Sequence, residues 1–136
     1  MRRLITLLLV LATTGAHAYC GKGHPSIEQE YADSSVVFRG LVNSSRQVPS
    51  AKGFEEGVVY TLAVQELVRG KLGRTVDVFS ENSSGRFPMK HGAEYLIFAY
   101  RDRGRLSVDN CGNSSELPAS TNALQAARRL SKRNVR

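Results

Sequence analysis

Residues 58–65 read Val58-Val59-Tyr60-Thr61-Leu62-Ala63-Val64-Gln65 and carry the clearest strand pattern in the chain. Large apolar side chains recur at every second position. One face carries Val58, Tyr60, Leu62 and Val64, and the other carries Thr61, Ala63 and Gln65. Because successive side chains of a strand point to opposite sides of a sheet, the pattern predicts a strand with one side against a core.

Four further segments have strand patterns around this one. We expect strands over residues 36–42, 75–80, 93–100 and 106–110, with Val76 and Val78 pointing inward and the apolar run 93–100 as a central strand. Residues 43–53, with several serines and Pro49, predict a loop. The sequence Arg101-Asp102-Arg103-Gly104 predicts a hairpin turn, because glycine adopts positive φ without strain.

A helix is expected at each end of this series of strands. The first runs from Pro25, which suits the first helical position, to about Asp33. The second can be capped by Ser120 and has an apolar stripe of Leu124, Ala127 and Leu130. Five strands between two helices predict a mainly β fold: a closed or partly open barrel, since closure removes exposed strand edges.

The first 18 residues resemble a secretory signal peptide. Arg2 and Arg3 precede a short apolar run, and Ala16-His17-Ala18 fits the small-x-small cleavage pattern. We therefore expect residues 1–18 to be removed, residues 19–119 to form the barrel domain, and residues 120–136 to form a basic C-terminal helix or tail. No second apolar segment approaches the roughly 20 residues that span a bilayer. The expected location is periplasmic or secreted.

The net charge and the sequence motifs limit the classes of function that we expect. The formal net charge is +7, part of which would leave with the signal peptide, so the chain is basic without being polybasic. We expect no nucleic-acid partner. No nucleophile elbow or carboxylate pair indicates catalysis, so we expect a non-enzymatic, monomeric binding protein with no cofactor and no catalytic residues.

Cys20 and Cys111 are the two cysteines of the chain, and in an exported protein two cysteines usually form a disulfide. Closing a loop of about 90 residues is worth roughly 4–5 kcal/mol in the chain-entropy model. The alternative is two free, buried thiols. A metal site is not expected, because neither His24 nor His91 has a ligand at zinc-binding spacing.

Six segments occur in a characteristic order. They are Cys20 with the following helix, residues 32–40, residues 64–70 ending in Arg-Gly, Ser84-Gly85-Arg86-Phe87, residues 92–99, and Leu106-Ser107-Val108-Asp109-Asn110-Cys111. Together they resemble the netrin-type module, the OB-like barrel found in the N-terminal domain of tissue inhibitors of metalloproteinases. The chain is most similar to the small secreted bacterial members, and the resemblance covers nearly the whole expected mature chain. The resemblance implies a five-stranded, OB-like barrel.

The chain departs from this family at two cysteines. Members often begin Cys-x-Cys and carry a Cys-Gly pair before the Tyr-Leu-x-Phe strand, whereas this chain has a single N-terminal Cys20 and reads Ser84-Gly85. In the inhibitors the two missing cysteines pair with each other. The resemblance therefore implies that one whole bridge has been lost and that Cys20–Cys111 has been kept.

The resemblance also implies a function. The inhibitors chelate the zinc of their target with the α-amino group and carbonyl of the first residue, which here would be Tyr19, held by the neighbouring Cys20. The implied partner is a zinc metalloendopeptidase. The alternative is that Tyr19 and Cys20 merely begin the barrel, and that the protein binds another envelope or extracellular protein through its loops.

The C-terminal segment offers a further alternative. Arg128, Arg129, Lys132 and Arg133 crowd the expected last helix and could bind an anionic surface. They could equally form a solvated helix face whose cations complement the helix dipole.

Overall fold

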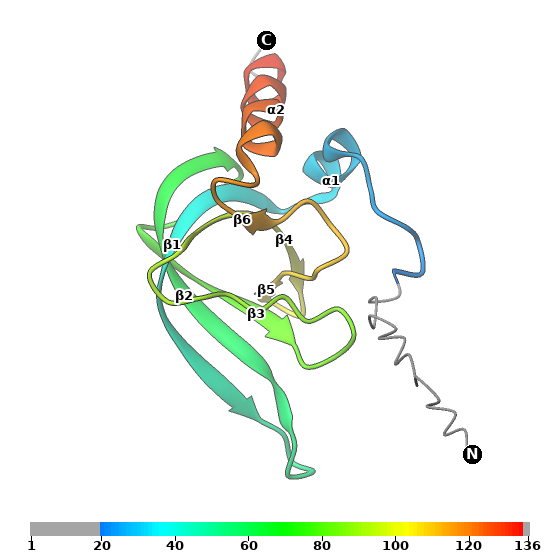
Figure 1. Cartoon of the computed structure of the whole chain (residues 1–136), viewed down its shortest axis with the longest axis vertical. Coiled ribbons are helices and arrows are strands. Elements are labelled where there is room, and N and C mark those ends of the chain that lie inside the picture. The colour runs from blue at the N-terminus through cyan, green and yellow to red at the C-terminus, as the bar shows by residue number, and fades with distance from the viewer. Residues whose placement is uncertain (1–19, 135–136) are drawn as a thin grey trace, which may run out of the picture.

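The computed structural model describes residues 20–134; the expected signal peptide and Tyr19 lie outside this range. The described chain is mainly β, with one six-stranded sheet and two helices (Figure 1). In order, its elements are α1 (Ile27–Asp33), β1 (Val36–Pro49), β2 (Glu55–Arg69), β3 (Thr75–Glu81), β4 (Glu94–Asp102), β5 (Arg105–Ser107), β6 (Ser115–Glu116) and α2 (Thr121–Arg133). No helix in this range is long and apolar enough to cross a membrane.

The sheet closes into a ring through the five expected strands. Its order is β1-β2-β3-β5-β4-β6, and β1 also pairs with β4. All but one of these pairings are antiparallel; β3 and β5 run parallel and meet only at Phe79 and Ser107. The β3–β5 contact is therefore the shortest connection in the ring. The sixth strand, β6, was not expected; its two residues pair with β4 outside the ring.

Alternate residues of the strands fill the inside of the ring. The predicted inward face of β2 is confirmed: Leu62 is fully buried there, and Val64 packs against the same cluster. Val78 of β3 is also fully buried, as predicted. The buried cluster consists of Val36, Phe38, Val42, Val58, Tyr60, Leu62, Val78, Phe87, Met89, Tyr95, Ile97, Ala99, Leu106 and Val108.

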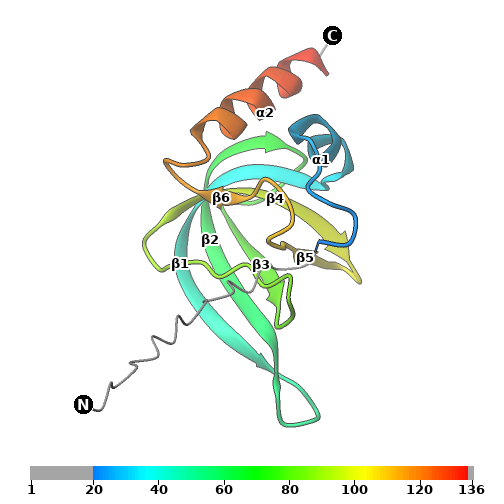
Figure 2. The same cartoon turned by 45° about the vertical axis from the view of Figure 1, so that its right-hand side comes forward.

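A second core lies on the outer face of β1 and β4, under both helices. Val37 and Leu96 are fully buried, although they point away from the ring interior. Leu124 and Ala127 of α2 join them, which confirms the predicted apolar stripe. Figures 1 and 2 place α1 and α2 together at one end of the molecule. Burial on both faces explains why residues 36–38 and 95–99 are apolar at consecutive positions.

The prediction of a loop over residues 43–53 was wrong for most of its length. β1 continues to Pro49, and its polar residues pair in register with β2, from Ser44 opposite Thr61 to Pro49 opposite Glu55. This part of β1 is mostly exposed on both faces, so it has no alternating burial pattern. The β1–β2 hairpin projects beyond the rest of the molecule, opposite the helices (Figures 1 and 2).

Two element boundaries and the capping of one helix also differ from the prediction. Pro25 lies outside α1, because Ser26 is the N-cap and accepts a hydrogen bond from the Gln29 backbone N–H at 3.1 Å. β5 ends at Ser107 rather than residue 110, since the Asn110 N–H donates to the Gly85 carbonyl. Ser120 occupies the N-cap of α2, but its hydroxyl donates to the Ser115 carbonyl instead of capping the helix.

Candidate functional site

The disulfide fixes the start of the described chain to the end of the ring. Cys20 and Cys111 are bonded, with their Cα atoms 5.6 Å apart and a sequence separation of 91. The predicted pairing is therefore confirmed, and free thiols are excluded for these two residues. Disulfides persist in oxidising compartments, so the bond is consistent with the expected location outside the cytoplasm.

A tight turn follows Cys20. Its carbonyl accepts a hydrogen bond from the Gly23 N–H at 2.9 Å, and Gly23 has a φ of 72°. Residues 21–24 are exposed, whereas Cys20 is half-buried. The Cys20 carbonyl therefore closes this turn. Tyr19 itself lies outside the described residues.

Glu30 lies beside the disulfide in a hollow of about 250 Å³, which Lys22 and Asp109 also line. Its carboxylate accepts hydrogen bonds of 2.6 Å from both the backbone N–H and the side-chain amide of Asn113. Burial raises the pKa of Glu30, and the hydrogen bonds from Asn113 only partly offset this effect. Glu30 therefore links α1 to the segment that follows Cys111.

Gly112 makes this arrangement possible. A Cβ atom at this position would collide with Oε1 of Glu30, so no larger residue fits unless the carboxylate moves. On the other side of the disulfide, the Cys111 N–H donates to the Asp109 carboxylate at 2.8 Å. Asp109 and Gly112 therefore both help to hold the cross-link in place.

A second hollow, of about 390 Å³, adjoins the first and shares Lys22, Glu30 and Asp109 with it. Tyr100 lines its rim, and burial followed by the nearby Asp109 charge raises the pKa of the phenol. In residues 20–134, no three His, Cys, Asp or Glu side chains are grouped so that they could hold a metal ion. The two hollows form an acidic surface next to the chain start.

The four predicted cationic residues of α2 differ in their contacts. Arg128 is joined to Glu66 of β2 by two hydrogen bonds of 2.7 and 2.6 Å, and this contact lowers the pKa of Glu66. Arg129, Lys132 and Arg133 are exposed, and no ion pair joins them to another described residue. Arg128 therefore attaches the helix to the sheet, and three cations remain for an external anion.

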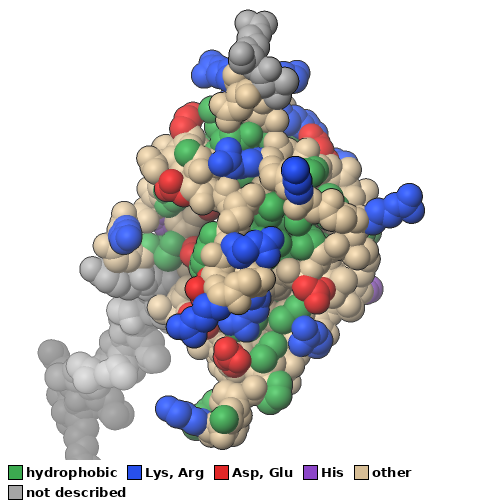
Figure 3. Space-filling view, turned by 180° about the vertical axis from the view of Figure 1, so that it is seen from behind, with side chains coloured by type: hydrophobic (Ala, Val, Ile, Leu, Met, Phe, Trp, Pro, Cys, Tyr) green, Lys and Arg blue, Asp and Glu red, His purple; other side chains and the backbone are tan. Residues whose placement is uncertain are grey.

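Positive charge is spread over the surface rather than gathered in one patch. On the face seen in Figure 3, Lys and Arg side chains lie from one end to the other, with Asp and Glu between them. Net charge alone therefore does not locate a binding site. A binding site is better located by hollows in the surface, by unpaired backbone groups and by the order of side chains along the strands.

Sequence reasoning found Cys20 and Cys111 but missed Glu30, Asp109 and Gly112. Asn113 lies 83 positions from Glu30, and no spacing rule connects residues so far apart. The glycine directly after Cys111 is the one local signal, since glycine often marks a close approach of other atoms.

No protein-family model matches this chain, and no curated protein matches it. The resemblance to the netrin-type module therefore stays a prediction from the ordered motifs.

Proposed function

We propose that the exported chain is a non-enzymatic, netrin-like module with an OB-type barrel, and that its N-terminal segment inhibits a zinc metalloendopeptidase. The observation that carries the proposal is the Cys20–Cys111 bond, which ties the start of the chain to the ring of strands. The closed ring, the helices that precede and follow it in sequence, and the ordered motifs also agree with this reading.

The proposed chemistry needs only the first residue of the mature chain. After cleavage behind Ala18, the α-amino group and carbonyl of Tyr19 would replace the water on the enzyme's zinc. An α-amino group has a pKa of about 7.7–8.0, so a metal can readily displace its proton. The Cα atoms of Tyr19 and Cys20 are about 3.8 Å apart, so the cross-link limits the entropy that Tyr19 loses on binding.

The β1–β2 hairpin provides a second point of contact in this proposal. Phe54 at its tip is 77% exposed, and it lines a shallow hollow with Val48 and Pro49. An exposed aromatic side chain on a projecting hairpin is a common anchor for a protein partner. We therefore assign the hairpin tip a role in partner affinity and the N-terminal segment the inhibition itself.

The test is an inhibition assay on thermolysin and other zinc metalloendopeptidases with a fluorogenic peptide substrate. N-terminal sequencing first verifies that the exported protein begins at Tyr19. Adding one alanine before Tyr19 should weaken inhibition at least 100-fold, because the chelating amine is displaced. The double variant Arg129→Gln, Lys132→Gln serves as the control and should inhibit as well as the unmodified protein. Equal inhibition by the extended and unmodified chains would disprove the zinc-chelating role.

A second candidate function is binding to an anionic surface through α2. The exposed Arg129, Lys132 and Arg133 favour it. The variant with all three changed to Gln should lose binding to vesicles containing phosphatidylglycerol, while the alanine-extended chain should keep it. Retained binding by the triple variant would rule out this role for α2.

A further inference from the structure

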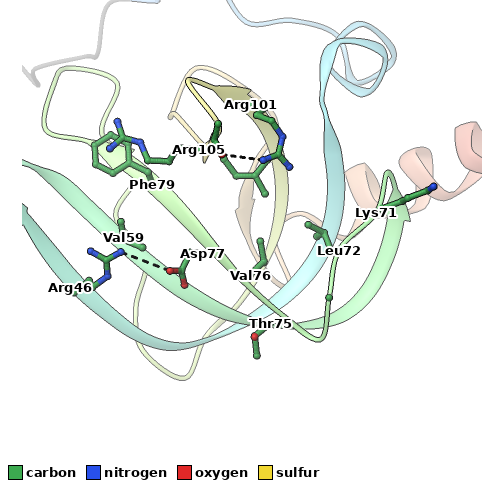
Figure 4. A pocket seen from close by; sticks show the side chains of 13 residues that line it. Arg46, Val59, Lys71, Leu72, Thr75, Val76, Asp77, Phe79, Arg101 and Arg105 are labelled. Atoms are coloured by element: carbon green, nitrogen blue, oxygen red, sulfur yellow. Dashed lines mark hydrogen bonds and ion pairs between the residues drawn. The ribbon is translucent and has the colours of Figure 1, made fainter.

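The strand β3 has one edge that is paired over only part of its length. All seven of its residues pair with β2, but on the opposite side it meets β5 at Phe79 alone. β5 is three residues long, so among the described strands none covers residues 75–78 on this side. A cleft of about 560 Å³ lies there, between β3 and the β4–β5 hairpin (Figure 4). We call it the β3 cleft.

Backbone groups of β3 face this cleft. The Arg74 carbonyl, just before the strand, accepts from Val64 of β2, whereas the Phe79 carbonyl accepts from the Val108 N–H on the opposite side. Peptide groups alternate in direction along a regular strand, so Thr75 and Asp77 direct theirs the same way as Phe79. No backbone hydrogen bond joins either residue to another described segment on that side. The edge therefore offers both N–H donors and C=O acceptors.

Cations from four separate segments surround the edge. The β3 cleft is lined by Arg46 of β1, Lys71 of the β2–β3 turn, Arg101 of β4 and Arg105 of β5. The one acidic side chain in the lining is Asp77, which lies 3.9 Å from Arg46. Arg105 in turn lies 3.6 Å from Glu56, which is outside the lining, so Lys71 and Arg101 carry the unpaired positive charge of the cleft and favour an anionic ligand.

The inner and outer faces of the sheet carry different side chains at the β3 cleft. Leu72, Val76 and Leu106 belong to or pack against the core inside the ring. Phe79 and Asp77 lie on the outer face, where the Arg105 guanidinium sits 3.5 Å from the centre of the Phe79 ring. Figure 4 shows Arg105 against Phe79 and Arg46 beside Asp77. A strand added here would place alternate side chains against apolar and cationic surfaces.

We propose that the β3 cleft binds a short, extended acidic peptide, which adds to the sheet as a strand along residues 75–77. Its backbone pairs with Thr75 and Asp77, as in other cases of strand addition. Acidic side chains at alternate positions contact Lys71 and Arg101, the two lining cations that form no ion pair with another described residue, and the apolar side chains between them lie toward Leu72 and Val76. The proposed peptide binding does not depend on the proposed inhibition.

The edge favours a peptide over a nucleic acid or a sulfated glycan. A nucleic acid or a sulfated glycan has no row of N–H and C=O groups at the spacing of a strand, so it cannot pair with both the donors and the acceptors of Thr75 and Asp77. The Phe79 ring is already covered by Arg105, so it is not open for a base to stack on. A second copy of this chain is also disfavoured, because two basic clefts would repel each other.

The test is titration of the protein with a fluorescein-labelled, acetylated hexapeptide of alternating Glu and Val at about 50 mM salt. The double variant Lys71→Gln, Arg101→Gln should weaken binding about tenfold, since two cationic contacts are lost. The double variant Arg129→Gln, Lys132→Gln removes the same charge from α2 and should bind normally. Equal weakening by both variants would overturn the proposal, because net charge alone would then explain binding.

The backbone part of the proposal has its own readout. The bound peptide should slow hydrogen exchange at the Thr75 and Asp77 amides. N-methylation of alternate peptide residues should abolish both the binding and the slowed exchange. Unchanged exchange at these amides would disprove strand addition. A sulfated oligosaccharide or a single-stranded oligonucleotide that displaces the peptide and binds more tightly would overturn the assignment to an acidic peptide. So would the absence of peptide binding.

Discussion

Removing the cross-link with the double variant Cys20→Ser, Cys111→Ser should strongly destabilise this protein. The bond closes a loop with a sequence separation of 91. The chain-entropy model assigns such a loop about 4.6 kcal/mol at 25 °C, because the reduced unfolded chain has many more conformations. Single domains are stable by only about 5–15 kcal/mol, so a large part of the total would be lost. The expected fall in Tm is roughly 15–20 °C.

The assay is urea unfolding followed by far-UV circular dichroism, because the chain has no tryptophan. Unmodified protein in a reducing agent should match the double serine variant, and the reducing agent should leave that variant unchanged. The Glu30–Asn113 contacts connect the same two segments, but they are absent from the unfolded chain and so do not reduce the entropic effect. A loss below about 1 kcal/mol would refute this reasoning, since the loop-closure entropy would then be offset by strain or by residual structure.

Three more predictions follow from the contacts within the fold. Leu62→Ala should lower the free energy of unfolding by about 2–5 kcal/mol in urea titrations, because it leaves a cavity at a fully buried position inside the ring. Gly112→Ala should cost about 1–3 kcal/mol through its collision with Glu30, and Glu30→Ala in the same chain should recover part of the loss; strictly additive effects in this double-mutant cycle would contradict the contact. The two perturbed carboxyl groups should give opposite pH dependences when the urea midpoint is measured from pH 3 to 7. The raised pKa of Glu30 means that its contribution falls as pH rises from the unfolded value through the folded one, so Glu30→Gln should gain stability relative to the unmodified protein over that window. The lowered pKa of Glu66 means that its contribution is present above the unfolded pKa and is lost as pH falls through the folded value, so Glu66→Gln should remove that loss.

The predictable parts of this fold are those whose burial leaves a local pattern. Residues 58–65 alternate because one face of β2 packs inside the ring, and α2 shows its stripe because Leu124 and Ala127 pack on the sheet. The disulfide was predictable because the chain has two cysteines. In these places the local residue pattern and the tertiary environment agree.

The missed parts lack such a pattern. The outer half of β1 is exposed on both faces, so Ser44, Ser45 and Arg46 show no alternation although they pair with β2. β6 has two residues, too few for any periodicity. The cations of the β3 cleft come from four segments, which only ring closure brings together. Arg128 and Arg129 look alike in the sequence, and only the position of Glu66 in the fold gives Arg128 an acidic partner.

The long reach of the Cys20–Cys111 bond also constrains how the protein matures. If the chain enters an oxidising compartment N-terminus first, Cys20 arrives early and its partner only after most of the domain has followed. Until Cys111 emerges, Cys20 is an available thiol that can react with other proteins or with small oxidants. In that order of export the native bond forms late, and an enzyme that resolves mixed disulfides between Cys20 and other thiols should increase the yield of native protein.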